Sequence, residues 1–313
     1  MVIRRIGELA AGTLRPVAVR DDRNLIISVN TCAAEYSVEG GRLVVRCAWQ
    51  GRDETGFEGR RVIVDDDTWL AMCPTTPVTC RVASEREVRS LTIVYRPGFA
   101  ESVLQTLLTP DDRLLARGES ASLCPLPFAS HLQPHDRSVT PVLMFIKRYS
   151  DMGLDDELWY EEQLAFLLER LLSRHRQILD RARAIPARRS ATRREIMRRI
   201  ALSTDFIHSS YERTLTLDDM AGAACLSRHH FLRLFKAVHG VTPHEFLQRK
   251  RTLVAARLLK ESERGVEEIV QRVGFDSRST LFRALRRFHG VTPRQCRRST
   301  TVSSTPLSAY AVA

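Results

Sequence analysis

The chain has 313 residues, enough for about two domains of ordinary size, and 43% of them are hydrophobic, which excludes a chain that is disordered throughout. Its formal net charge of +11 makes an acidic partner a natural candidate. No apolar run approaches the ~20 residues that cross a bilayer, and the N-terminal sequence MVIRRIGELAAGTLRPVAV lacks the apolar core of a signal peptide. These features predict a soluble protein of the cytoplasm.

The seven cysteines favour the same compartment, because an odd number without a CxxC pair is expected of reduced thiols rather than of a secreted disulfide framework. Cys73 and Cys80 flank the sequence PTTPVT, where a thiol sensor or a zinc pair is possible, but buried structural cysteines fit better. His131 and His135 have an HxxxH spacing that Pro134 interrupts, so they do not share a clean helix. We therefore expect no metal and no cofactor.

Residues 14–96 are predicted to form short strands, because segments rich in Val, Ile and Thr alternate with clusters of Gly, Pro and Asp. The predicted strands are 25–30, 42–49, 60–64, 68–72, 78–84 and 88–95. Strands of this length and spacing are typical of an antiparallel barrel or sandwich, here of cupin-like type. Helices are predicted at about 98–108, 138–150 and 155–183, with a Pro- and Ser-rich loop at 122–136.

The longest of these helices has an apolar stripe on one face. The stripe consists of Leu158, Ala165, Leu168, Leu172 and Leu179. It could pack against the protein's own β domain or form a subunit interface. The second interpretation predicts a homodimer, and that Leu168→Asp with Leu172→Asp gives a monomer. The Arg-rich sequence RARAIPARRSATRR at 181–194 is predicted to be a linker.

The positive charge is concentrated in one segment. Residues 191–300 contain 22 Lys and Arg against 11 Asp and Glu, while the rest of the chain carries 26 of each kind. A basic block of this kind is typical of a nucleic-acid-binding domain, although a solvated basic surface has the same composition.

The pentapeptide HGVTP occurs at 239–243 and again at 289–293, because a larger unit is repeated. At an offset of fifty Phe231 aligns with Leu281, and at an offset of forty-nine Met220 aligns with Ile269, so the second copy has one extra residue in its turn. Each copy predicts a short helix, a tight turn and a second helix ended by glycine, which is a helix-turn-helix.

A single helix is predicted between the two copies, at 244–260. Its 17 residues span about 26 Å, whereas successive major-groove faces of B-DNA lie about 34 Å apart. A stiff helix of this length suits two helix-turn-helix units that dock along one face of a duplex.

The same residues carry a family resemblance. AARLLKES at 255–262 and VEEIVQRVGFDSRSTLFRALRRFHGVTPRQCR at 266–297 resemble the DNA-binding domain of the AraC/XylS family of transcription regulators. Val270, Leu285 and Cys296 depart from the family pattern, and all three are substitutions between core-type residues. The N-terminal half resembles the family's sensor half in layout only.

The resemblance implies an α+β chain of two domains, with an all-α double helix-turn-helix at its C-terminal end. We expect a β-rich sensor domain at 1–150, a dimerisation and connector helix with its linker at 151–192, a DNA-binding domain at 193–300 and a disordered tail at 301–313. The implied partners are double-stranded promoter DNA, RNA polymerase, a second copy of the chain and an unknown small-molecule effector.

Recognition helices contact base edges through exposed residues near their N-terminal ends. The candidate DNA-binding residues are Arg228, His229, Leu232 and Arg233 in the first helix-turn-helix and Arg278, Ser279, Thr280, Phe282 and Arg283 in the second. Arg suits the acceptors of guanine and an apolar side chain suits a thymine methyl group, although each Arg could instead contact a phosphate or the solvent. Ser227 and Ser277 are the candidate phosphate contacts.

Two other classes of protein share parts of this pattern. A DNA-repair alkyltransferase can join cysteine acceptors to an AraC-like module, but the N-terminal cysteines here are spread out. An architectural DNA-binding protein would not need the β domain. No phosphate-binding loop, nucleophile elbow or paired-carboxylate motif occurs, so we expect no enzyme.

Overall fold

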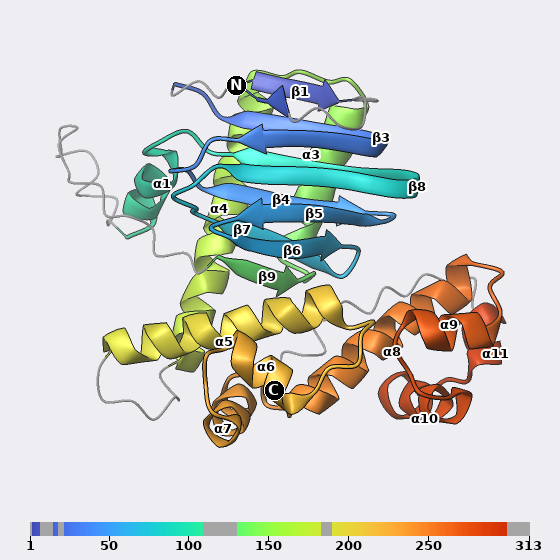
Figure 1. Ribbon diagram of the computed structural model, residues 1–313. Coiled ribbons are helices and arrows are strands. Elements are labelled where there is room, and N and C mark those ends of the chain that lie inside the picture. The colour runs from blue at the N-terminus through green and yellow to red at the C-terminus, as the bar shows by residue number, and fades with distance from the viewer. Residues whose placement is uncertain (1, 7–14, 18–21, 109–129, 183–189, 299–313) are drawn as a thin grey trace. The chain divides into compact units, whose positions relative to one another are not determined.

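The computed structural model describes residues 2–6, 15–17, 22–108, 130–182 and 190–298 (Figure 1). Contacts between Cα atoms divide the chain into two compact units, with the boundary between Asp180 and Arg181. Among the described helices, none has the length and apolar character that crossing a membrane requires.

In its described residues, the first unit is a nine-stranded sheet with three helices. Its strands are β1 (Val2–Ile6), β2 (Arg15–Pro16), β3 (Leu25–Val38), β4 (Val44–Trp49), β5 (Arg52–Phe57), β6 (Arg60–Asp65), β7 (Thr68–Met72), β8 (Val78–Val94) and β9 (His131–Pro134). Its helices are α1 (Phe99–Leu108), α3 (Thr140–Asp151) and α4 (Glu157–Ala182).

The long strand β8 organises this sheet. It pairs antiparallel with β3 along most of its length, with β4 through one half and with β5 through the other. The sheet order is β1-β3-β8-β4-β7-β9, and the β5–β6 hairpin also contacts β4 and β7. The sheet therefore curls toward a closed barrel, as predicted, with β1 and β2 added to β3 in parallel.

The two faces of the sheet bury different side chains, because successive residues of a strand point to opposite sides. On β3, Leu25 and Ile27 belong to one hydrophobic cluster and Ile26 to the other. The cluster that contains Ile26 also takes in α3 and α4, which lie behind the sheet in Figure 1. Lys147 fixes α3 to β3, donating to the Ser28 hydroxyl at 2.9 Å and to the Asn30 side-chain oxygen at 2.7 Å.

The six predicted strands correspond to five observed ones, because 78–84 and 88–95 are parts of the continuous strand β8. Strands β1, β2, β5 and β9 were not predicted. The sequence RDETGF of β5 is polar, and its inward-facing residues include Asp53 and Thr55, which the buried side chain of Arg46 contacts. The segment at 131–134 was predicted to be a loop, yet it pairs with β7 and buries Leu132. Both predictions were wrong because tertiary pairing outweighs a weak local pattern.

The apolar face of α4 packs inside its own unit. Leu164, Leu167 and Leu168 are fully buried in the cluster shared with the sheet and α3, whereas the side chain of Leu158 is 80% exposed. The interpretation of Leu168 as a subunit contact was therefore wrong, because this side chain already has its neighbours within the chain. The side chain of Leu179 lies outside the described residues.

The second unit is helical. Its helices are α5 (Ser190–Ser210), α6 (Leu217–Ala223), α7 (Arg228–His239), α8 (Pro243–Glu261), α9 (Val266–Arg272), α10 (Arg278–His289) and α11 (Pro293–Arg298). The predicted linker at 181–194 is thus partly helical, since α4 extends to Ala182 and α5 begins at Ser190. Residues 183–189 of that prediction lie outside the described residues.

One hydrophobic core runs through the whole second unit, and α8 is its centre. This helix contacts α5, α6, α7, α9, α10 and α11. Leu247, Val254 and Leu259 of α8 lie in the same cluster as Phe231 of α7 and Leu281 of α10. The two predicted helix-turn-helix units are therefore held by one helix in one core.

Each of the two HGVTP sequences ends one helix and begins the next. Gly240 and Gly290 end α7 and α10 with φ of 73° and 67°, which glycine adopts readily. The prolines that follow are the first residues of α8 and α11. The predicted stop and restart of the chain is confirmed at both places.

Candidate nucleic-acid interface

The first helix-turn-helix joins α6 and α7 through four residues. Thr216 begins α6 with a capping box: its hydroxyl accepts the Asp219 N–H at 3.2 Å, and the Asp219 carboxylate accepts the Thr216 N–H at 2.8 Å. Cys225 in the turn has φ of 50°, a left-handed conformation uncommon outside glycine. Ser227 stands at the N-cap of α7, and its side chain makes no capping bond.

The second helix-turn-helix joins α9 and α10 through five residues, so the predicted extra residue is confirmed. Gly274 has φ of 79°, and a Cβ atom there would lie 2.6 Å from the Glu212 carbonyl oxygen. The turn thus needs glycine for its dihedral angle and for its close approach. Ser277 caps α10 by accepting the Thr280 N–H at 3.2 Å, and the two hydroxyl groups lie 3.0 Å apart.

The outer faces of α7 and α10 carry all the residues predicted to contact bases. Exposed side chains are those of Arg228, His229, Arg233, Arg278, Ser279, Phe282 and Arg283, and half-buried ones are those of Leu232 and Thr280. The opposite faces are buried in the core through Phe231 and Phe235 on α7 and Leu281 and Leu285 on α10. Each recognition helix therefore packs one face into the core and exposes the other face, where a ligand could bind.

The first arginine of each recognition helix is paired with a carboxylate of the preceding helix. Arg228 donates from Nε to Asp218 Oδ1 at 2.8 Å, and its second nitrogen pairs with Oδ2 of the same group. Arg278 donates from Nε to Glu267 Oε2. All four side chains are more than half exposed, so both pairs lie on the surface that carries the candidate residues.

Sequence reasoning missed these two carboxylates, although the repeat contains a signal for them. Asp218 aligns with Glu267 at the offset of forty-nine, and Arg228 aligns with Arg278 at the offset of fifty. The same acid–base pair is thus present in both copies. The two offsets differ by the extra residue in the turn, so no single alignment places each carboxylate beside its arginine. Only the structure shows that the two side chains meet.

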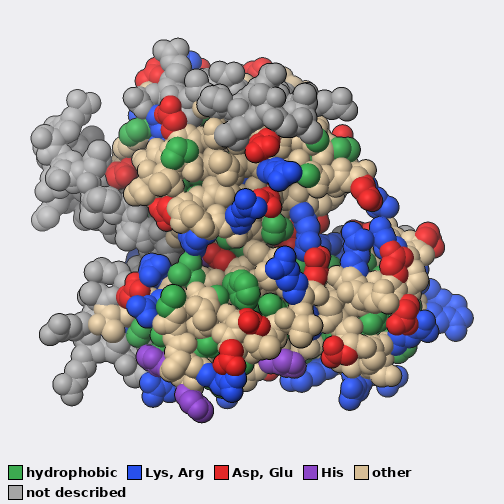
Figure 2. Space-filling model, in the orientation of Figure 1, with side chains coloured by type: hydrophobic (Ala, Val, Ile, Leu, Met, Phe, Trp, Pro, Cys, Tyr) green, Lys and Arg blue, Asp and Glu red, His purple; other side chains and the backbone are tan. Residues whose placement is uncertain are grey.

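The two recognition helices lie toward the same side of the second unit. In Figure 1, α7 and α10 are both at the lower edge, and α8 runs between them. Figure 2 shows Lys and Arg side chains gathered over the right-hand end of this unit, where Figure 1 places α9, α10 and α11. A basic surface beside a recognition helix, as at α10, is the arrangement expected for binding a polyanion.

Known proteins match this helical region. A model of a helix-turn-helix domain matches residues 220–299. A putative AraC-like transcription regulator from Streptomyces lividans is 34% identical over 103 residues, which are 33% of this chain and 34% of that protein. The probable transcription factor PqrA from Proteus vulgaris is 30% identical over 91 residues, which are 29% of this chain and 75% of that protein. The chain belongs to the AraC/XylS family of transcription regulators.

The likeness to these AraC/XylS relatives covers about a third of the chain. The probable transcriptional regulator LumQ from Photobacterium leiognathi is 30% identical over 94 residues, which are 30% of this chain and 38% of that protein. The chain thus spans about a third of the length of the curated relatives that it matches first. The match of residues 220–299 to a helix-turn-helix domain places this likeness in the second unit.

The first unit of this AraC/XylS protein contains a buried ion pair. Arg46 of β4 donates to Asp53 Oδ2 at 2.5 Å and to the Thr92 hydroxyl at 3.1 Å, and both charged side chains are 1% exposed. The Tyr36 and Thr92 hydroxyls lie 2.9 Å apart in the same group. A charged pair inside a sheet is stable only when such hydrogen bonds accompany it.

Four large side chains of the first unit, Trp49, Trp69, Tyr95 and Arg96, have mixed positions. Trp69 and Tyr95 are buried in the core, and the Tyr95 hydroxyl donates to the Leu164 carbonyl at 3.2 Å. Trp49 and Arg96 are half-buried, and Arg96 lies over the Phe99 ring at 5.2 Å. Aromatic core packing therefore accounts for Trp69 and Tyr95.

Cys73 and Cys80 of the first unit are poor candidates for reactive thiolates. Burial raises the pKa of Cys73 to about 12 and that of Cys80 to about 12, and the thiolate is the nucleophilic form. Within the described ranges, no group of three His, Cys, Asp or Glu side chains could hold a metal ion. Cys124 lies outside those ranges.

Proposed function

We propose that the chain is a sequence-specific DNA-binding transcription regulator that reads two neighbouring segments of one duplex. The observation that carries the proposal is the duplicated helix-turn-helix, whose recognition helices α7 and α10 share one core with α8. Each helix keeps a polar and basic face exposed. A major groove admits one α-helix, and two helices on one rigid element suit two successive grooves.

The base-reading residues of this proposal are those predicted from the sequence. Arg228, Arg233, Arg278 and Arg283 carry donors that match guanine. Leu232 and Phe282 supply apolar contacts, and the exposed ring of Phe282 is available for a thymine methyl group. The remaining predicted contacts are His229, Ser279 and Thr280, whose hydroxyl lies against Ser277 in the free protein.

Phosphate contacts at the starts of the recognition helices complete the proposed interface. Ser227 makes no capping bond, so its hydroxyl is free to donate to a phosphate oxygen. Ser277 accepts the Thr280 N–H and shares a hydrogen bond with the Thr280 hydroxyl, so a phosphate contact by its own hydroxyl would replace that second bond. The first-turn N–H groups of both helices add donors for the same anion.

We propose the first unit as the sensor and dimerisation part of the regulator. Its curled sheet, with a helical cover, is the part to which a small effector would bind, and the identity of that effector is open. Five of the seven exposed large hydrophobic side chains in the described part of the chain lie between residues 144 and 158. They are Met144, Phe145, Met152, Leu154 and Leu158. We propose this apolar surface, rather than Leu168 and Leu172, as the contact between two copies.

RNA polymerase is the further partner proposed for such a regulator, and the cytoplasm is its proposed location. A role as a DNA-repair alkyltransferase requires a reactive cysteine, and the raised pKa of Cys73 and Cys80 disfavours that chemistry at these two thiols. A methyl-transfer assay combined with zinc analysis separates the two functions. Methyl uptake by a cysteine would contradict the regulator proposal.

Selection of binding sites from random double-stranded DNA by the full chain tests the function. We expect one enriched motif that contains two short conserved segments, one for each recognition helix. Recovery of random sequence at physiological salt would instead indicate an architectural protein. Chromatin immunoprecipitation followed by sequencing then identifies the regulated genes, whose products point to the effector.

A further inference from the structure

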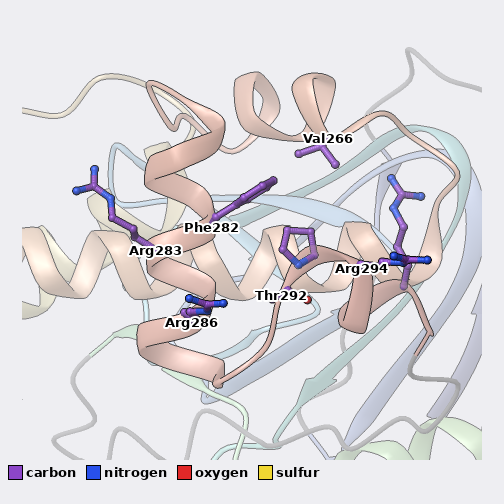
Figure 3. Close-up of a pocket in the computed structure, with 8 residues that line it drawn as sticks. Val266, Phe282, Arg283, Arg286, Thr292 and Arg294 are labelled. Carbon is purple, nitrogen blue, oxygen red and sulfur yellow. The ribbon is translucent and has the colours of Figure 1, made fainter.

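A pocket of about 590 Å³ lies in the second unit between α10, α11 and the start of α9. Its walls combine basic and apolar side chains, and we call it the arginine pocket. The basic residues are Arg283, Arg286, Arg294 and Arg297, and the apolar residues are Val266, Phe282 and Pro293. Figure 3 shows the Phe282 ring directed from α10 toward Val266 and the start of α11, with Arg294 across the opening.

No carboxylate of the described residues neutralises the positive charge of this pocket. Arg286 and Arg294 are exposed, and neither side chain has an ion-pair or hydrogen-bond partner in the described part of the chain. Arg297 donates to the Ser262 and Arg264 carbonyl oxygens, which hold its guanidinium at the wall but do not remove its charge. Guanidinium groups around one pocket repel one another, and an anion bound among them relieves that repulsion.

Two other arginines of α10 do have carboxylate partners. Arg287, the next residue on α10, lies 3.5 Å from the Glu245 carboxylate and over the Phe288 ring at 5.1 Å. Arg278 at the start of α10 is paired with Glu267. Arg283 also lines the pocket region but extends from the other side of α10 in Figure 3. Among the described residues, the arginines of α10 that line the pocket, Arg283 and Arg286, are therefore the ones without a carboxylate partner, whereas Arg278 and Arg287 have one.

We propose that the arginine pocket binds the sugar-phosphate backbone of the DNA strand that flanks the second recognition helix. Guanidinium groups bind phosphate oxygens through paired, charge-assisted hydrogen bonds, so Arg286 and Arg294 would hold one or two phosphates. The apolar wall of Val266, Phe282 and Pro293 would contact the deoxyribose between them. Phe282 then has one edge toward the backbone and one toward the base edges.

Continuity with the recognition helix favours DNA over a free anion. Phe282 lies one turn before Arg286 on α10, so a strand contacted by the first is within reach of the second. The pocket thus lengthens the proposed interface from α10 onto α11. This inference rests on the proposed function, and it adds contacts that carry no base preference.

The test compares Arg286→Gln and Arg294→Gln, singly and together, with Arg287→Gln as the matched control. All single variants remove one positive charge, and Arg287→Gln removes it from the same helix outside the pocket. Affinity of the full chain is measured against salt concentration, on the selected site and on a scrambled duplex. Phosphate-ethylation interference on the selected site identifies the backbone positions that each variant still touches.

We expect each pocket variant to bind both duplexes about tenfold more weakly at moderate salt. The slope of log affinity against log salt should fall by about 0.9 for each phosphate that the variant no longer neutralises. Interference at one or two phosphates beside the second segment should disappear in the double variant and persist in Arg287→Gln. Thermal unfolding of the pocket variants should be unchanged, because Arg286 and Arg294 are exposed and have no side-chain partner among the described residues.

Three results would overturn the pocket assignment. The first is an equal weakening in Arg287→Gln, which would indicate a general charge effect. The second is a changed base preference in the pocket variants with an unchanged salt slope, which would make these arginines base readers. The third is an unchanged interference pattern. Failure of the proposed function is distinct, because the unaltered chain itself would then not distinguish the selected site from the scrambled duplex.

Discussion

Arg278 at the start of α10 donates to Glu267 on α9, and this contact repeats the pair that Arg228 forms with Asp218 in the first helix-turn-helix. A carboxylate beside an arginine that faces DNA has two opposing effects. It repels the phosphates, which weakens binding to any sequence, and it fixes the direction of a flexible side chain. Since the pair is present in both copies, we expect the second effect to matter for base reading.

The change Glu267→Gln removes the negative charge that holds Arg278. We expect tighter binding to scrambled DNA and a smaller preference for the selected site, because the guanidinium is then free to contact phosphates. Glu268→Gln is the matched control, since Glu268 is the adjacent residue and pairs with Arg264. Competition binding with the two duplexes measures the preference. Equal behaviour of the two variants would show that Glu267 acts only through net charge.

Arg278→Ala should relax base choice at one position of the second segment. A well-placed arginine contributes about 1–3 kcal/mol of discrimination against a wrong base. Binding-site selection with the variant checks this expectation, and the first segment, which α7 reads, should remain unchanged. An unaltered motif from the variant would assign Arg278 to the phosphate backbone or to its ion pair alone.

The positions of Leu158 and Leu168 on α4 lead to opposite expectations. Leu168→Asp places a charge in the core of the first unit and should destabilise it by more than about 4 kcal/mol. Leu158→Asp should change stability by less than about 0.5 kcal/mol, since this side chain is 80% exposed. Thermal unfolding of both variants measures the difference. Equal stability of the two would contradict the assignment of Leu168 to the core.

The exposed apolar surface also makes a prediction about oligomeric state. Leu158→Asp together with Phe145→Asp should keep the fold and convert a dimer to a monomer, because both side chains are more than half exposed. Light scattering over a range of protein concentration measures the mass. A folded double variant that keeps the mass of a dimer would place the contact between copies elsewhere.

The sequence predicted the second unit better than the first, for a physical reason. Helix caps, glycine stops and the apolar period of 3.6 residues are local signals, and the repeat supplied each of them twice. Strand β5 has no such signal, because Asp53 and Thr55 face inward toward Arg46. The ion pair of Arg278 with Glu267 also depends on how two helices meet, which no local pattern contains.

Gly274 and Gly290 show two different reasons why a position requires glycine. Both have positive φ, but only Gly274 lies against backbone, where a Cβ atom would approach the Glu212 carbonyl oxygen to 2.6 Å. Gly290→Ala should destabilise the chain by about 1–2 kcal/mol through its dihedral angle alone. Gly274→Ala should cost about 2–5 kcal/mol, because the clash is added. Urea unfolding ranks the two, and the reverse order would contradict this account of the turn.

Hydroxyl-radical footprinting on a selected site tests the central claim most directly. That claim is that the two recognition helices, held by α8, bind one face of a duplex. We expect two protected segments on the same face, with centres about 10 base pairs apart. Leu232→Ala with Arg233→Ala should weaken protection of one segment, and Phe282→Ala with Arg283→Ala should weaken the other. A single protected segment that responds to only one of these pairs of substitutions would contradict the account.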